Sequence, residues 1–134
     1  MTLNKIILID DDETTNLLNR RMVKKMEITD EVVLFSDGKL AMDYLTSLEG
    51  KFDDLPELIF LDVRMPVMGG FDFLDAYIEL KQSKAQKTKI IMLSTSLRDE
   101  DMNKAKSFGV ADYVAKPLNK ALVSSLIKKH FKDE

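Results

Sequence analysis

Five short, nearly continuous apolar runs lie along the chain, separated by stretches in which apolar residues recur every three or four positions. A short continuous run predicts a strand covered on both faces, whereas the helical period predicts an amphipathic helix. We expect the strands at residues 5–9, 31–35, 58–61, 89–93 and 111–115. Five strands therefore alternate with five helices, without internal repeats or low-complexity linkers.

The expected helices are recognised by apolar stripes, and their limits by polar residues and breakers. The stripes are Leu18, Met22 and Met26; Ala41, Tyr44, Leu45 and Leu48; Phe71, Leu74 and Ile78; a short helix within 99–108; and Leu122, Val123, Leu126, Ile127 and Phe131. Asp12 is a suitable N-cap for the first helix. The polar stretch 81–87 is expected to be a loop.

This alternation predicts an α/β fold with a parallel five-stranded sheet and helices on both of its faces. Five such units are typical of the flavodoxin-like doubly wound fold, (βα)5, with strand order 2-1-3-4-5. In that order the first and third strands are neighbours, and a crevice opens at their carboxyl ends. The length of 134 residues fits one domain, spanning 1–134.

Composition excludes several classes of function. The formal net charge of -3 argues against a nucleic-acid partner, which normally needs a basic face. The chain has no cysteine, and no apolar run approaches the length of a membrane span. Because residues 1–5 lead directly into a strand, we expect no signal sequence and a cytoplasmic protein. His130, among lysines near the C-terminus, is expected to be an exposed helix-end residue.

Four of the five expected strands end in groups that can carry chemistry: Asp10 and Asp11, Asp62, Ser94, and Lys116. A lone aspartate in such a turn is usually an exposed surface residue, but parallel strands would bring all of these groups to one edge. Three crowded carboxylates repel one another unless a cation lies among them, and oxygen ligands without His or Cys favour Mg²⁺. A lysine and a hydroxyl would suit a phosphoryl group, for which aspartate is a known nucleophile.

With these motifs the chain resembles a response-regulator receiver domain over essentially its whole length. The matching segments are residues 9–11, 61–66 with Gly70, 94–95 and 113–117. The resemblance implies the following roles: Asp62 as phosphoacceptor, Asp11 and Asp62 as Mg²⁺ ligands with the backbone carbonyl of Arg64, Asp10 as a ligand through bound water, Ser94 as switch hydroxyl, Tyr113 as switch aromatic, and Lys116 as the cation that pairs with the phosphoryl group. It also implies a cis Lys116–Pro117 peptide bond.

The same resemblance implies a signalling switch rather than an enzyme with an external substrate. The phosphoryl group would come from a sensor histidine kinase, a phosphotransfer protein or a small phosphodonor, and Mg²⁺ would be the cofactor. The fourth helix, fifth strand and fifth helix would form the surface read by a downstream protein. Arg64, Gly69 and Thr95 depart from the usual family pattern, and Arg64 is expected to cover the site and slow loss of the phosphoryl group.

Three other functions are compatible with this fold class. A Mg²⁺-dependent phosphatase with an aspartyl-phosphate intermediate would commonly have a second acid two residues after Asp62, where this chain has Arg64. A flavin or nucleotide binder would cradle phosphate after the first strand, where residues 10–13 are all acidic. A phosphate-independent receiver-like binding module would not need the complete motif set that is present here.

Overall fold

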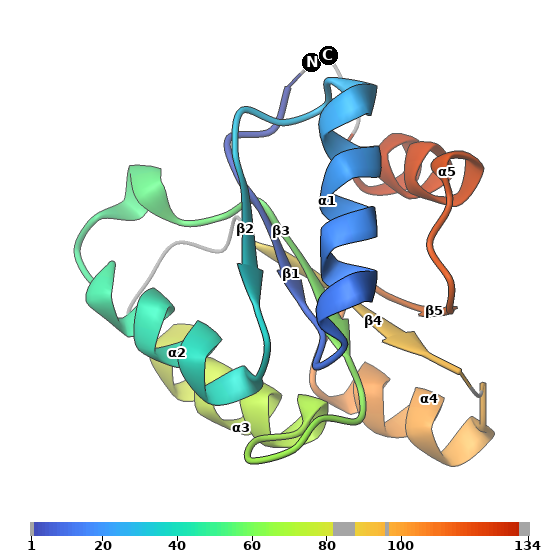
Figure 1. Cartoon of the computed structure of the whole chain (residues 1–134). Coiled ribbons are helices and arrows are strands. Elements are labelled where there is room, and N and C mark those ends of the chain that lie inside the picture. Colours follow the sequence, from blue (N-terminus) through green and yellow to red (C-terminus); the bar gives the residue numbers. More distant parts are fainter. Residues whose placement is uncertain (1, 82–87, 96, 132–134) are drawn as a thin grey trace.

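A computed structural model describes residues 2–81, 88–95 and 97–131, and it contains one five-stranded parallel sheet (Figure 1). The strand order is β2-β1-β3-β4-β5, so the predicted doubly wound fold is confirmed. The strands are β1 (Ile6–Ile9), β2 (Val32–Phe35), β3 (Leu58–Asp62), β4 (Lys89–Ser94) and β5 (Asp112–Ala115). The helices are α1 (Glu13–Met26), α2 (Gly38–Ser47), α3 (Gly70–Lys81), α4 (Asp99–Ser107) and α5 (Lys120–His130), with a short 3-10 turn at Phe52–Asp54.

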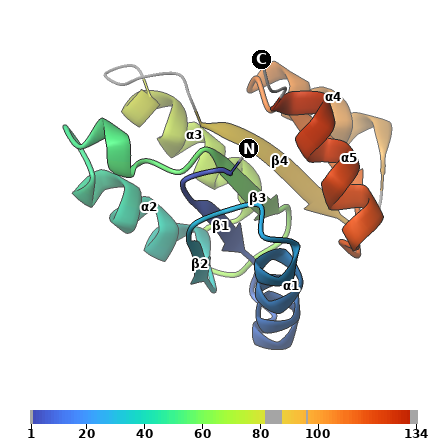
Figure 2. The ribbon, with the colours of Figure 1, turned by 90° about the horizontal axis from the view of Figure 1, so that it is seen from above.

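Helices cover both faces of the sheet and bury two apolar clusters. Viewed from above, α1 and α5 lie on one side of the strands and α2 and α3 on the other (Figure 2). Alternate side chains of β3 divide between the layers: Ile59 and Leu61 belong to one cluster, and Leu58 and Phe60 to the other. All five residues of β3 are buried, which explains its nearly continuous apolar sequence.

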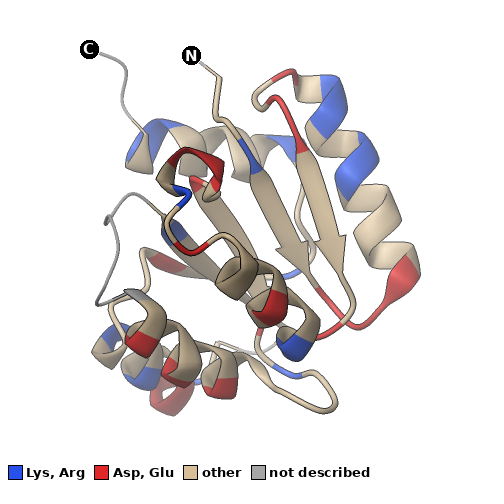
Figure 3. Ribbon diagram, turned by 90° about the vertical axis from the view of Figure 1, so that its left-hand side faces the viewer, with Lys and Arg blue, Asp and Glu red and all other residues tan. Residues whose placement is uncertain are grey.

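The helix starts were partly predicted from the sequence. The carboxylate of Asp12 accepts a hydrogen bond from the Thr14 backbone N–H, so the predicted N-cap is confirmed. The predicted stripe of α1 is wrong at Leu18, a residue that is 58% exposed. The buried line runs instead through Asn16 and Val23, which are seven residues apart on one face. Lysines and arginines gather in the later turns of α1, as Figure 3 shows, and Arg21, Lys24 and Lys25 are exposed.

The C-terminal histidine also differs from expectation. His130 is not fully exposed: its side chain is 13% accessible, and its Nε2 lies 2.9 Å from Asp112 Oδ2. This contact joins the end of α5 to the start of β5, and it was hidden in the sequence because the two residues are 18 positions apart. Most of the expected 81–87 loop lies outside the described residues, while α3 continues through Lys81. Among the described helices, none is both long and apolar enough to cross a membrane.

The turn after β3 brings the start of α3 against the sheet. A Cβ at Gly70 would lie 2.7 Å from the Asp62 carbonyl oxygen, so glycine is required by close approach. Earlier in the turn, Val67 has φ 67°, and the Met68 N–H donates to the Pro66 carbonyl at 2.7 Å. A β-branched residue in this left-handed conformation is strained.

We therefore expect Val67→Gly to stabilise the protein. Val67 is 81% exposed, so the change loses little packing, and relief of about 1–2 kcal/mol of strain exceeds the extra entropy that glycine has when unfolded. The net gain in free energy of unfolding should be about 0.5–1 kcal/mol by urea denaturation. Val67→Ala is the control, because it shortens the side chain but leaves the backbone strained. A glycine variant less stable than wild type would contradict this interpretation.

Candidate functional site

The predicted residues gather at the carboxyl edge of the sheet. The parallel register pairs Ile9 with Leu61, and Asp62 with Leu93, so the chain leaves β1, β3 and β4 at nearly the same level. Residues Asp10, Asp62 and Ser94 are 3%, 6% and 6% exposed, respectively. Acidic groups at this edge can be followed in Figure 3.

Three carboxylates and one ammonium group form the centre of the site. One oxygen from each of Asp10, Asp11 and Asp62 lies within 4.8 Å of the others. The Nζ of Lys116 lies 2.8 Å from Asp10 Oδ2 and 3.4 Å from Asp62 Oδ2. The sequence prediction that these four residues meet is therefore confirmed. Lys116 contacts the two buried acids, Asp10 and Asp62, whereas Asp11 is exposed to solvent.

Burial and neighbouring charge set the protonation of the site. Burial, followed by the negative charge of Asp10, raises the pKa of Asp62 to about 6, although Lys116 opposes the change. Burial alone would lower the pKa of Lys116, but its hydrogen bond to Asp10 and the charge of Asp62 raise it overall. At neutral pH Asp62 is therefore mostly ionised.

The donor set fits a hard divalent cation. Carboxylate oxygens without nitrogen or sulfur ligands suit Mg²⁺, which binds through one or two carboxylates and keeps several waters. The Arg64 backbone N–H donates to the Asp62 carboxylate, which favours its ionised form and opposes the rise in its pKa. The Arg64 side chain is exposed, and its shielding role stays a prediction.

Comparison with known proteins identifies the family. The family model named response regulator receiver domain matches residues 6–128 of this chain. This chain belongs to the response regulator receiver domain family.

This receiver domain is similar to parts of longer regulatory proteins and to a solved structure of about the same length. The chain is 32% identical over 115 residues to the probable methanogenesis regulatory protein FilR2 of Methanothrix harundinacea, covering 85% of this chain and 72% of that protein. It is 37% identical over 118 residues to the transcriptional regulatory protein CpxR of Escherichia coli, covering 87% of this chain but only 44% of CpxR. A two component response regulator from Cytophaga hutchinsonii has a similar structure, with a TM-score of 0.87, 28% identity, and coverage of 99% of this chain and 100% of that one.

Two further residues of the receiver domain were expected to act as a switch. Ser94 ends β4, and its backbone carbonyl accepts a hydrogen bond from Lys116 N–H at 2.8 Å. Tyr113 is 9% exposed, and its buried hydroxyl has no hydrogen-bond partner among the described residues. The Lys116–Pro117 peptide bond is cis, as predicted.

One buried residue beside the site was not found from the sequence. Asn16, 4% exposed, sits in the first turns of α1 and donates from Nδ2 to the Asp10 and Phe35 carbonyls, at 2.9 and 3.1 Å. A polar residue in a helix is usually assigned to the surface. The available signal was its position seven residues before the buried Val23.

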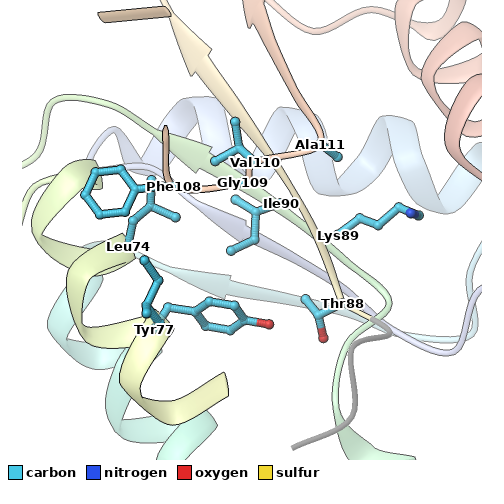
Figure 4. Close-up of a pocket in the computed structure, with 10 residues that line it drawn as sticks. Leu74, Tyr77, Thr88, Lys89, Ile90, Phe108, Gly109, Val110 and Ala111 are labelled. Atoms are coloured by element: carbon cyan, nitrogen blue, oxygen red, sulfur yellow. The ribbon is translucent and has the colours of Figure 1, made fainter. Parts of the chain in front are cut away.

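The receiver domain also contains a pocket, lined by both apolar and polar groups, away from the acidic cluster. This cavity of about 280 Å³ lies between α3, the start of β4 and the segment before β5 (Figure 4). Ile90, Leu74 and Phe108 line it, and Tyr77 and Thr88 add hydroxyls. Ser94 lies at the other end of β4 from this pocket, so the acidic cluster is a separate site.

Proposed function

We propose that this receiver domain accepts a phosphoryl group on Asp62, in a reaction assisted by Mg²⁺, and thereby changes a surface read by another protein. The donor would be a sensor histidine kinase, a phosphotransfer protein or a small phosphodonor. The observation that carries the proposal is the buried carboxylate of Asp62, held among two other acids and within 3.4 Å of the Lys116 ammonium. Intact mass after incubation with acetyl phosphate and Mg²⁺ is the direct test.

The chemistry follows from the groups that face Asp62. A carboxylate oxygen of Asp62 forms a bond to phosphorus while the bond from phosphorus to the donor atom breaks in line, and the leaving group takes the electron pair. The Lys116 ammonium, which already contacts two acids, would pair with the incoming phosphoryl oxygens. Mg²⁺ would be held by Asp11 and Asp62, with the Arg64 carbonyl and with Asp10 through water, and would neutralise charge on the transferring group.

The proposed output uses Ser94 and Tyr113. The Ser94 hydroxyl would move to donate a hydrogen bond to an oxygen of the new phosphoryl group. The Tyr113 ring would then rotate into the space that Ser94 vacates. Burying the Tyr113 hydroxyl without a partner costs about 1–3 kcal/mol, so a conformation in which it meets a partner or water competes with the buried one. We propose the α4-β5-α5 face as the surface on which a partner reads this change.

Arg64 occupies the position where a phosphatase of this kind would commonly have its second acid, so we do not propose phosphatase activity.

A prediction follows for the metal ligands. Mg²⁺ should raise the thermal midpoint of wild type, because a ligand that binds only the folded state stabilises it. Asp11→Ala should lose most of this rise, since it removes one of three carboxylates in the cluster. Differential scanning fluorimetry with and without Mg²⁺ measures the effect.

The control for this prediction is the neighbouring acid. Asp12→Ala removes the N-cap of α1 and should destabilise the protein, but its response to Mg²⁺ should be retained. An undiminished Mg²⁺ response in Asp11→Ala would refute the ligand role of Asp11.

A further inference from the structure

A single amide group ties α1 to the carboxyl ends of two strands. Asn16 Nδ2 donates to the carbonyl of Asp10, immediately after β1, and to the carbonyl of Phe35, the last residue of β2. Both bonds cross between elements, and the side chain is almost completely buried. Asn16 therefore fixes the turn between β1 and α1 from inside the protein.

The contacts of Asp10 show which part of this turn depends on Asn16. The Asp10 N–H donates to Phe35, Oδ1 accepts from the Asp12 N–H at 2.9 Å, and Oδ2 lies 2.8 Å from Lys116 Nζ. The Asp10 carbonyl, held by Asn16, belongs to the peptide that joins Asp10 to Asp11. The plane of that peptide determines where the chain places Asp11.

Asp11 has little else to hold it. Its side chain is exposed and makes no hydrogen bond or ion pair within the described ranges, yet its carboxylate lies within 4.8 Å of two other acids. Like charges at this distance repel one another, which favours movement of Asp11 away from the cluster. A fixed Asp10–Asp11 peptide opposes that movement.

Packing alone does not account for an asparagine at this position. Its Oδ1 is buried without a partner among the described residues, a cost that a leucine of similar size would not have. What the amide adds is its two donated hydrogen bonds. We infer that Asn16 is a positioning residue, which strengthens Mg²⁺ binding by holding the Asp10–Asp11 peptide in the orientation that brings the carboxylates together.

This inference rests on the proposed function, and it is tested by Mg²⁺ affinity measured directly. Isothermal titration calorimetry of the full chain should show Asn16→Leu binding Mg²⁺ on the order of tenfold more weakly than wild type, a typical effect of removing a group that orients ligands. Rates of phosphorylation by acetyl phosphate should then need more Mg²⁺ for half-saturation but reach a similar plateau. A change in stability alone would not shift the half-saturating concentration in the folded protein.

Asn4 supplies a control at the amino-terminal end of the strands, far from the acidic cluster. Its Nδ2 also donates to two backbone carbonyls, those of Leu55 at 2.7 Å and Asp53 at 3.2 Å. Asn4→Leu should reduce stability but keep Mg²⁺ affinity within about twofold of wild type. Mg²⁺ affinity within about twofold of wild type in Asn16→Leu would overturn the inference.

Two further outcomes are separated by the design. If Asn16→Leu does not fold, Asn16→Gln is tested instead, because it keeps the amide but displaces it by one methylene. Mg²⁺ affinity of Asn16→Gln within about twofold of wild type overturns the inference, and a larger loss of affinity supports it. If wild type binds Mg²⁺ but takes up no phosphoryl group, the proposed function fails, whereas the comparison of Mg²⁺ affinities still decides the role of Asn16.

Discussion

Asp62→Asn will gain no phosphoryl mass under conditions in which the wild-type chain gains one group. The amide cannot supply the anionic oxygen that attacks phosphorus. Among the other described carboxylates, only Asp10 is also buried at a strand end and within ion-pair distance of Lys116. Asp10 already uses Oδ1 for the Asp12 N–H and Oδ2 for Lys116, so it is a poor substitute. Intact mass spectrometry after incubation with acetyl phosphate and Mg²⁺ measures the difference.

The matched control is Asp12→Asn, the same change at an acid outside the cluster that should label like wild type. Equal labelling of wild type and Asp62→Asn would show that the acceptor is another residue. Absence of labelling in wild type, with both acetyl phosphate and histidine-kinase donors, would favour a phosphate-independent binding module.

The same substitution should make the metal-free protein more stable near neutral pH. The pKa of Asp62 is about 6 in the folded protein, above its ordinary value of 3.8, so folding favours the protonated carboxyl. The stability that this gives is complete below about pH 4 and is lost as pH rises through 6. At pH 7.5 without Mg²⁺, Asp62→Asn should therefore exceed wild type by about 1–3 kcal/mol in free energy of unfolding.

Urea denaturation in chelator at pH 4 and pH 7.5 checks this prediction. The two proteins should differ much less at pH 4, where Asp62 is protonated, and Mg²⁺ at pH 7.5 should narrow or reverse the difference by stabilising wild type. Asp12→Asn again serves as control, since Asp12 is exposed and lies outside the cluster. The same difference in stability at both pH values would mean that the folded protein does not disfavour the ionised form of Asp62.

The fold and the central acids were predictable because one physical rule determines both. Continuous apolar runs require a buried parallel sheet, and parallel strands end at a common edge. Asp10, Asp62 and Lys116 each follow such a run, so their meeting follows from topology and needs no knowledge of side-chain packing. The cis bond before Pro117 was expected from the family resemblance rather than from this rule.

The remaining features depend on packing between elements, which sequence period does not specify. Leu18 has the right spacing for a buried stripe, but the rotation of α1 on the sheet puts Asn16 and Val23 inside instead. The contact of His130 with Asp112 joins residues 18 positions apart, and neither sequence neighbourhood indicates the other. The left-handed backbone of Val67 is likewise set by closure of the turn before α3, against the preference of valine.

The short outer strands of the sheet limit how this domain can associate. β2 and β5 form the two edges, and each has only four residues. An incoming strand would therefore find few free backbone groups at either edge. Joining sheets edge to edge, a common route to aggregation, is therefore disfavoured, and a partner at the proposed α4-β5-α5 face should contact side chains rather than add a strand to the sheet.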